Sequence, residues 1–570
     1  MNSNSRVKTP QQAVDKTMPF HKYKPFEPIA LKDRTWPDQV ISQAPRWCSV
    51  DLRDGNQALI EPMSPAQKQQ MYDLLVALGF KEIEVGFPAA SQADFDFVRN
   101  IIEGGLIPAG LTIQVLCQAR KELITRTCEA VQGAGDVVFH LYNSTSTLQR
   151  KVVFGMSREE IIKLATDATA LVKEYTQPLV DAGTNVILEY SPESYTATEM
   201  DFAVEICAAV MEVWQPTAEN KIILNLPSTV EMATPNVYAD QIEYFIRHLP
   251  ERHTAVISLH THNDRGTGVA ASELGLMAGA ERIEGTLFGN GERTGNCDLI
   301  TMAMNLFSQG IDPELYLSDM PGIVAVSESC TKIPIHVRQP YAGELVFTAF
   351  SGSHQDAIRK GMSHVESGSD GAWEVPYLPI DPADVGGSYR ETVRVNSQSG
   401  KGGVAFILEH YFGVQLPREI LLELSPIIQA VSEVDGGELK PETIWNTFVN
   451  EFVEVKGPYQ LLDYQIHTID MEREKCTARL AVSESEVDIS GEGSGPIDAF
   501  VAALIETLNE PLNVVDYQEY ALNEGSEAQA ISILSISDDL QRKYYGVGIS
   551  KNTTTAAFKS IIAAINRKWR

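Results

Sequence analysis

Two histidines separated by one residue are the clearest chemical signal in the sequence. His260 and His262 stand in the stretch LHTHNDRGTG, at the end of an apolar run. Alternate side chains of a strand point to the same face, so both imidazoles can converge on one metal ion. Asp54 would add a carboxylate, and a nitrogen and oxygen donor set completed by an asparagine favours Mg²⁺ or Mn²⁺, with Zn²⁺ or Co²⁺ as alternatives. The competing interpretation is a pair of hydrogen-bonded core histidines.

The elements that must position these residues are eight short apolar or β-branched runs separated by stretches with helical spacing. The runs are residues 46–54, 81–88, 112–119, 136–143, 185–190, 221–226, 255–262 and 282–288. Strands that alternate with helices predict βαβ units and a parallel sheet. Eight such units in about 240 residues predict an α/β fold of the closed (β/α)₈ type, a TIM barrel, rather than an open sheet.

Reactive side chains gather at the ends of these runs, where a barrel of this type carries its active site. The residues concerned are Arg53, Asp54, Glu84, His140, Ser191, Glu193, Asn225, Pro227, Thr229, His260, His262 and Asn296. The glycine-rich stretch GNGERTG follows the eighth run and lacks the spacing of a dinucleotide-binding fingerprint. The sequence therefore predicts one metal-assisted active site at the carboxyl end of the barrel.

Composition excludes several classes of protein. The chain has 570 residues and a net charge of −30, which argues against nucleic-acid and anionic-membrane partners. Its seven cysteines are scattered and form no CxxC pair, which disfavours a disulfide framework and suits a reducing cytoplasm. No apolar run approaches the roughly 18 residues of a membrane span. We therefore expect a cytoplasmic protein of several globular domains.

The character of the sequence changes on either side of the predicted barrel. Residues 1–45 are expected to form an N-terminal arm, 46–343 the barrel, and 344–457 a helical and irregular linker region. Residues 458–570 are expected to form an α+β domain in which a βββα unit occurs twice. Each unit is predicted to place a glycine loop before its helix, GEGSG at 491–495 and GVGIS at 546–550. Such a loop can bind a carboxylate, so dimerisation or small-molecule sensing is expected here.

Long motifs throughout the chain closely resemble those of the 2-isopropylmalate synthase family in its long form. They are VDLRDGNQAL (50–59), EIEVGFP (82–88), SPESYTATE (191–199), LHTHNDRGTG (259–268), FGNGERTGN (288–296), FTAFSGSHQDAI (347–358) and VPYLPIDP (375–382). The resemblance implies condensation of acetyl-CoA with 2-oxoisovalerate, followed by thioester hydrolysis to 2-isopropylmalate and CoA. This is the first committed step of leucine biosynthesis.

The resemblance also implies a role for each barrel residue. The metal ligands would be Asp54, His260, His262 and Asn296. Arg53 would stabilise the keto oxygen, Glu84 would orient the cluster, and Thr229 would bind the oxoacid carboxylate. The side of the pocket that faces the isopropyl group would be formed by His140, Ser191, Glu193, Asn225 and Pro227.

Two further catalytic groups are implied outside the barrel. In the family the general base is the histidine of SGSHQDA, here His354, with Tyr377 of VPYLP nearby. The family places the linker of one subunit over the barrel of its partner, which implies an obligate homodimer. The alternative is that His354 is a loop histidine without a chemical role.

The duplicated domain resembles the family's regulatory domain, where leucine binds between subunits as an allosteric inhibitor. The candidate regulatory residues are Gly491, Gly493, Gly495, Ala499, Gly546, Gly548 and Ala556. Three other functions are weighed against this one: a related condensing enzyme with a different oxoacid, a lyase of the same barrel family, and a catalytically inactive sensor protein.

Overall fold

The computed structural model describes residues 26–349, 351–366, 372–387, 401–435, 439–508, 512–522, 528–538 and 540–570. The chain divides into two compact units between Val346 and Phe347. Among the helices described, none is both long enough and apolar enough to cross a membrane.

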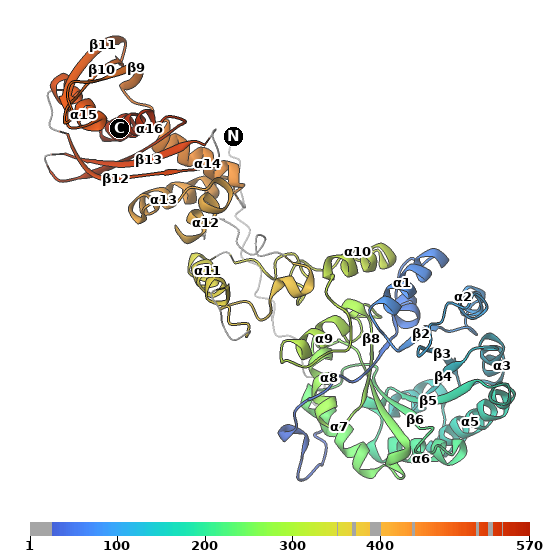
Figure 1. Ribbon diagram of the computed structural model, residues 1–570. Coiled ribbons are helices and arrows are strands. Elements are labelled where there is room, and N and C mark those ends of the chain that lie inside the picture. Colours follow the sequence, from blue (N-terminus) through green and yellow to red (C-terminus); the bar gives the residue numbers. More distant parts are fainter. Residues whose placement is uncertain are drawn as a thin grey trace, which may run out of the picture. The chain divides into compact units, whose positions relative to one another are not determined.

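The first unit contains a closed barrel of eight parallel strands in the order β1 to β8, which confirms the predicted fold (Figure 1). The strands are β1 (Arg46–Ser49), β2 (Glu82–Gly86), β3 (Thr112–Gln118), β4 (Asp136–Ser144), β5 (Asn185–Glu193), β6 (Ile222–Ser228), β7 (Ala255–Thr261) and β8 (Arg282–Gly285). β8 closes the barrel on β1, with Trp47 paired to Ile283. Strand residues are mostly buried, because one face fills the barrel and the other packs on the helices.

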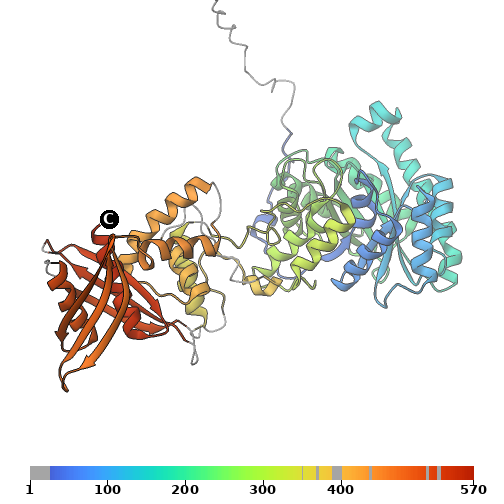
Figure 2. The same ribbon diagram turned by 90° about the horizontal axis from the view of Figure 1, so that it is seen from above.

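Helices surround the barrel (Figure 2). They are α1 (Pro65–Ala77), α2 (Gln92–Glu103), α3 (Lys121–Ala130), α4 (Thr147–Gln149), α5 (Arg158–Asp181), α6 (Met200–Trp214), α7 (Pro235–His248), α8 (Gly268–Met277), α9 (Leu299–Phe307) and α10 (Met320–Thr331). Local sequence explains where α1 begins: Ser64 and Gln67 form a reciprocal capping box, and Pro65 occupies the first turn, where its missing N–H is not needed.

The first and last barrel strands are shorter than the sequence predicted. β1 ends at Ser49 rather than Asp54, and residues Asp51–Gly55 form a π-helical turn in which the N–H of Gly55 donates to the carbonyl of Val50 at 3.1 Å. The carboxylate of Asp51 accepts the N–H of Leu287 at 3.1 Å, which ties this turn to the chain just after β8. The turn, and not the strand, therefore presents Arg53 and Asp54.

The second unit begins with a helical region. Its α-helices before the first sheet are α11 (Gly352–Glu366), α12 (Lys401–Phe412), α13 (Arg418–Asp435) and α14 (Pro441–Phe448). A π-helical turn, Val449–Val453, continues α14.

Two three-stranded antiparallel sheets follow, each completed by a helix, and they confirm the predicted pair of βββα units. The first has the order β11–β10–β9 and the second β12–β13–β14. The elements are β9 (Tyr459–Thr468), β10 (Glu474–Val482), β11 (Ser485–Gly493), α15 (Pro496–Leu508), β12 (Asn513–Ala521), β13 (Ala530–Ser537), β14 (Lys543–Ser550) and α16 (Thr553–Lys568). Both helices share one apolar core that includes Phe500 and Phe558. The opposite face of the second sheet packs on α12 and α14.

The glycine loop predicted at 546–550 is part of strand β14, so that prediction was wrong, and in the loop predicted at 491–495 only Ser494 and Gly495 lie outside β11. Gly491 lies inside β11, and Gly546 and Gly548 lie inside β14. A Cβ at Gly548 would stand 1.9 Å from the carbonyl oxygen of Ala556 on α16. A Cβ at Gly491 would stand 2.4 Å from the backbone nitrogen of Ala503 on α15. Glycine is needed because helix backbone packs directly on strand backbone, and not because the chain turns.

Candidate functional site

A cavity of about 640 Å³ opens where the barrel strands end. Ten of the predicted site residues line it: Arg53, Asp54, His140, Ser191, Glu193, Asn225, Pro227, Thr229, His260 and His262. They come from the turn after β1 and from β4, β5, β6 and β7, together with the residues that directly follow β6 and β7. The structure thus brings together residues up to 209 positions apart, the span from Arg53 to His262.

The three donors predicted to bind a metal meet in this cavity. The Oδ2 atom of Asp54 lies 3.3 Å from Nε2 of His260 and 3.9 Å from Nε2 of His262. All three side chains are buried, and their ligand atoms lie within 4.8 Å of one another. Donors at right angles around a small divalent ion, with bonds of about 2.1 Å, stand roughly 3 Å apart. These residues therefore fit such an ion after small side-chain adjustments.

Unsatisfied polar atoms at the same place support this fit. Within the part of the chain that the structure describes, Oδ2 of Asp54, Nδ1 of His262 and Oδ1 of Asn296 are buried and have no hydrogen-bond partner. Buried polar atoms are normally paired, so each orphan requires an explanation. A cation that takes up the two oxygens would provide one.

A folded-back loop after β8 carries Asn296 to the cluster. Asn296 forms an isolated β-bridge with His262, and its amide nitrogen donates to the carbonyl of Asn290 at 3.0 Å. The backbone N–H of Asn296 donates to the carbonyl of Gly289 at 3.0 Å. Gly295 has φ +100°, and a Cβ there would lie 1.9 Å from that same carbonyl oxygen. The glycines of GNGERTG therefore serve to close this loop.

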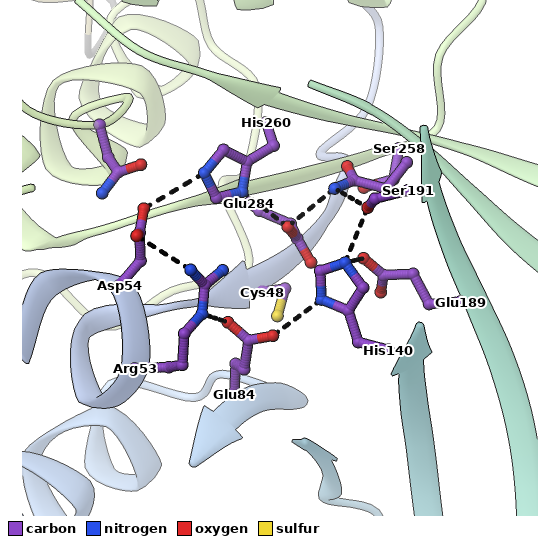
Figure 3. Close-up of polar contacts among 12 residues, drawn as sticks. Cys48, Arg53, Asp54, Glu84, His140, Glu189, Ser191, Ser258, His260 and Glu284 are labelled. Carbon is purple, nitrogen blue, oxygen red and sulfur yellow. Dashed lines mark hydrogen bonds and ion pairs between the residues drawn. The ribbon is translucent and has the colours of Figure 1, made fainter. Parts of the chain in front are cut away.

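Arg53 connects the metal donors to the pocket wall (Figure 3). Its Nη1 lies 2.9 Å from Oδ1 of Asp54, and its Nε donates to Glu84. The other oxygen of Glu84 contacts Nδ1 of His140 at 2.8 Å, and Nε2 of His140 contacts the hydroxyl of Ser191 at 2.7 Å. Glu84 is fully buried and does not line the cavity, so it orients its neighbours from below.

The electrostatics of the cluster favour positive charge beside Asp54. Burial opposes ionisation of Asp54, but the positive Arg53 holds its pKa well below the ordinary value. Burial also opposes charge on His260, yet the adjacent carboxylates of Asp54 and Glu284 raise its pKa to about 9. Burial, reinforced by His260, lowers the pKa of His262 to about 4. A cation between these donors would meet a carboxylate and a neutral imidazole.

A buried ionic network lies below the cavity, and sequence analysis missed it. Arg282 on β8 is completely buried and contacts Glu82 at 2.6 Å, Glu284 at 3.0 Å and Glu189 at 3.3 Å. Burial and the nearby charge of Glu284 raise the pKa of Glu189 well above its ordinary value. The available signal was alternation: Arg282 and Glu284 are charged residues two apart in a buried strand.

The cavity wall also contains residues that were not predicted, among them two on strands and two with positive side chains. Leu116 on β3 and Tyr142 on β4 lie two residues beyond Gln114 and His140, so strand alternation places each pair on one face. Lys68, paired with Asp94, and Arg293, paired with Asp264 at 2.7 Å, add positive charge to the wall. The net charge of the whole chain, −30, gives no indication of these positive side chains in the cavity wall.

His354 and Tyr377 lie in the second unit and contact each other. Their rings stack with centroids 3.9 Å apart and an interplanar angle of 22°. Tyr377 has φ +67°, a left-handed conformation that non-glycine residues rarely adopt, and 61% of the residue is exposed. Strained and exposed residues of this kind are typical of functional sites. Their role as catalytic groups stays a prediction.

The candidate regulatory residues form two matching contacts between strand and helix. Ala499 on α15 and Ala556 on α16 are fully buried and face Gly493 and Gly548. Gly495 lies outside the strand, with no atom of the described structure within 4 Å of an added Cβ. Leucine binding by these residues stays a prediction.

Comparison with known proteins matches three parts of the chain to known families. Residues 44–326 match the HMGL-like family, residues 344–409 the alpha-isopropylmalate synthase post-catalytic domain, and residues 438–569 the LeuA allosteric (dimerisation) domain. A 2-isopropylmalate synthase of Parafrankia sp. (strain EAN1pec) is 53% identical over 566 residues, 99% of this chain and 99% of that protein. One of Rhodospirillum rubrum is 54% identical, over 96% of this chain and 98% of that protein.

The closed barrel and its cluster of metal donors define an enzyme of the HMGL-like class that uses a divalent metal. The relatives match nearly the full length of the chain, including the residues that match the allosteric domain. The chain belongs to the 2-isopropylmalate synthase family.

Proposed function

We propose that this protein condenses acetyl-CoA with 2-oxoisovalerate and hydrolyses the thioester, releasing 2-isopropylmalate and CoA. The observation that carries the proposal is the convergence of Asp54, His260 and His262 beside Arg53 in one cavity. An acidic protein needs local positive charge to bind an anionic oxoacid. The metal site and Arg53 would supply it.

The chain's own residues can hold the oxoacid at both ends. A divalent ion bound by Asp54, His260, His262 and Asn296 would supply Lewis-acid polarisation of the keto group. Arg53 has five N–H donors, so its contacts with Asp54 and Glu84 leave others for the oxygen on which charge develops. The hydroxyl oxygen of Thr229 accepts the N–H of Ser194 at 2.9 Å, which leaves its O–H to donate to the substrate carboxylate. Mg²⁺ or Mn²⁺ suits this mixed donor set, with Zn²⁺ or Co²⁺ as alternatives.

The side-chain pocket would be formed by residues of three neighbouring strands. Ser191 and Glu193 come from β5, Asn225 and Pro227 from β6, and His140 from β4. The network of His140, Ser191 and Asn225 fixes the polar side of this pocket. One methylene more or less in a substrate changes its binding energy in such a pocket by only about 1–3 kcal/mol. Some turnover of related oxoacids is therefore expected.

The proton removed from the methyl group of acetyl-CoA requires a positioned base. We assign this role to His354, oriented by its stacking on Tyr377. The pair lies in a different unit from the metal donors, and the C-terminal region matches a dimerisation domain. We therefore propose a homodimer in which the linker of one subunit covers the barrel of the other.

Two further assignments follow from the same family. Leucine would act as an allosteric inhibitor through the C-terminal domain. Its binding there would shift a conformational equilibrium that ligand binding at the active site also shifts. The enzyme would work in the cytoplasm, since its seven cysteines are all unpaired and buried.

Substrate preference tests the proposal. Purified protein receives acetyl-CoA and Mg²⁺ or Mn²⁺ with 2-oxoisovalerate, pyruvate or 2-oxoglutarate, and a thiol reagent follows CoA release with and without leucine. We expect the highest kcat/KM with 2-oxoisovalerate, and lower rates when leucine is present. A preference for another oxoacid would overturn the substrate assignment. Absence of CoA release with all three would overturn the condensation itself, and a lyase assay would follow.

A further inference from the structure

We propose that Glu284 is a positioning residue that couples the metal site to the oxoacid pocket through one shared carboxylate oxygen. The proposal rests on the function proposed above, which makes His260 a metal ligand and Asn225 a pocket residue. Glu284 lies on β8, is completely buried and does not line the cavity. It therefore acts on the reaction only through its neighbours.

The shared atom is Oε2 of Glu284 (Figure 3). It lies 2.8 Å from Nδ1 of His260 and accepts the amide N–H of Asn225 at 3.2 Å. The same amide nitrogen of Asn225 donates to the hydroxyl oxygen of Ser191 at 3.0 Å. This one oxygen therefore contacts both a proposed metal ligand, His260, and a proposed pocket residue, Asn225.

The second oxygen anchors the carboxylate to the barrel interior. Oε1 of Glu284 accepts from Nε2 of Gln114 at 2.8 Å and from Nη1 of Arg282 at 3.0 Å. Arg282 is itself fixed by Glu82 at 2.6 Å and by the hydroxyl of Ser258 at 2.7 Å. Three N–H groups thus donate to the carboxylate and Nδ1 of His260 lies beside it, so its orientation is fixed.

This arrangement determines which nitrogen of His260 can bind a metal. A carboxylate can only accept, so Nδ1 of His260 must carry a proton. The remaining nitrogen, Nε2, faces Oδ2 of Asp54 at 3.3 Å and presents its lone pair to the ion when the ring is neutral. A partner of this kind orients a ligand histidine and raises its basicity.

The same contact fixes the amide of Asn225. Its nitrogen is held by Glu284 and Ser191, so its Oδ1 is directed away from both, and this oxygen has no partner among the described residues. If the restraint from Glu284 were lost, the amide could rotate and Ser191 would lose a donor. The pocket wall that meets the oxoacid would then be less ordered.

Glu284→Gln separates this role from general core stability. Whichever way it turns, a glutamine presents N–H groups to two donors, either to Gln114 and Arg282 or to His260 and Asn225. The matched control is Glu82→Gln, because Glu82 is also a buried partner of Arg282, at the opposite end of the guanidinium, and contacts neither His260 nor Asn225 in the described structure. A third variant, Asn225→Ala, isolates the pocket branch, and a double variant joins it to Glu284→Gln.

Two quantities are measured on the full-length protein: Mn²⁺ affinity by competition with a chelating dye, and KM for 2-oxoisovalerate at saturating Mn²⁺. We expect Glu284→Gln to weaken Mn²⁺ binding by about 10–100-fold and to raise KM roughly fivefold, the loss of one ordinary hydrogen bond. Glu82→Gln should leave both at wild-type values. Asn225→Ala should raise KM alone, and Glu284→Gln should add nothing to KM in that background.

Each result has a separate meaning. Wild-type Mn²⁺ affinity in Glu284→Gln, or equal losses in Glu82→Gln, would overturn the positioning role. Failure of the wild-type protein to bind Mn²⁺ would instead overturn the metal site of the proposed function. If Glu284→Gln does not fold, Glu284→Asp keeps the charge but withdraws it by one methylene, and it should change both quantities in the same direction. Unchanged values in that variant would also overturn the proposal.

Discussion

Substitution of Gly295 by alanine tests whether the loop after β8 holds Asn296 at the metal cluster. Gly295 has φ +100°, and its added Cβ would stand 1.9 Å from the carbonyl oxygen of Gly289. That oxygen accepts the backbone N–H of Asn296 at 3.0 Å. The new methyl group would therefore displace one of the backbone contacts that position Asn296.

The free-energy cost of Gly295→Ala is the sum of two effects. A left-handed backbone at a non-glycine residue costs about 1–2 kcal/mol, and overpacking of a fixed structure costs typically 1–3 kcal/mol more. The matched control is Gly266→Ala in the neighbouring loop, where φ is +74° and no described atom lies within 4 Å of the added Cβ. It should carry the backbone cost alone. The difference of about 1–3 kcal/mol corresponds to roughly 5–150-fold in Mn²⁺ affinity if the loop must close to bind the ion.

The assay compares Mn²⁺ affinity by dye competition and the shift in melting temperature that Mn²⁺ produces. We expect Gly266→Ala to retain wild-type affinity and Gly295→Ala to lose most of it, with a correspondingly smaller thermal shift. Equal affinities in the two variants would refute the reasoning, since either the loop tolerates the methyl group or Asn296 does not bind the metal.

Three further predictions concern other parts of the chain. Gly548→Ala should destabilise the C-terminal sheet by about 1–3 kcal/mol, because its Cβ would stand 1.9 Å from the carbonyl oxygen of Ala556. Faster hydrogen exchange in residues 553–568 measures this, and equal exchange in Gly495→Ala, which meets no described atom, would count against it. His354→Ala should lower kcat by about 10²–10⁴-fold with Mn²⁺ affinity retained, and near-normal turnover would remove its role as base. Burial raises the pKa of Asp51 to about 7, so the folded chain binds more protons than the unfolded chain between about pH 4 and 7, and stability falls as pH rises through that window. Asp51→Asn should flatten this slope in pH-dependent thermal unfolding, and an unchanged slope would contradict the assignment.

The barrel could be predicted because its signals are local and repeated. Each strand is an apolar run, each is followed by a helical stretch, and the reactive residues stand at the ends of the runs. The π-helical turn at Asp51–Gly55 could not be predicted in this way, because it depends on a contact between Asp51 and Leu287 across 236 positions. The position of Glu284 in its network likewise depends on Gln114, Arg282 and Asn225, which come from three strands.

The glycines of the C-terminal domain show a different limit. Glycine-rich stretches usually indicate turns, so the sequence predicts a loop at GVGIS. In the structure it is a strand whose glycines admit the backbone of α16 at Ser560 and Ala556. A close approach between two elements and a turn both favour glycine, so the residue type alone cannot distinguish them.

The proposed metal site in the barrel should be essential for the condensation. The most direct test removes metal from the protein with a chelator, adds Mn²⁺ back in steps with acetyl-CoA and 2-oxoisovalerate present, and measures CoA and 2-isopropylmalate together by mass spectrometry. We predict no product without metal, equal amounts of CoA and 2-isopropylmalate at every step, and saturation when one ion is bound per chain. CoA release without 2-isopropylmalate, or product formation that does not depend on metal, would contradict the account.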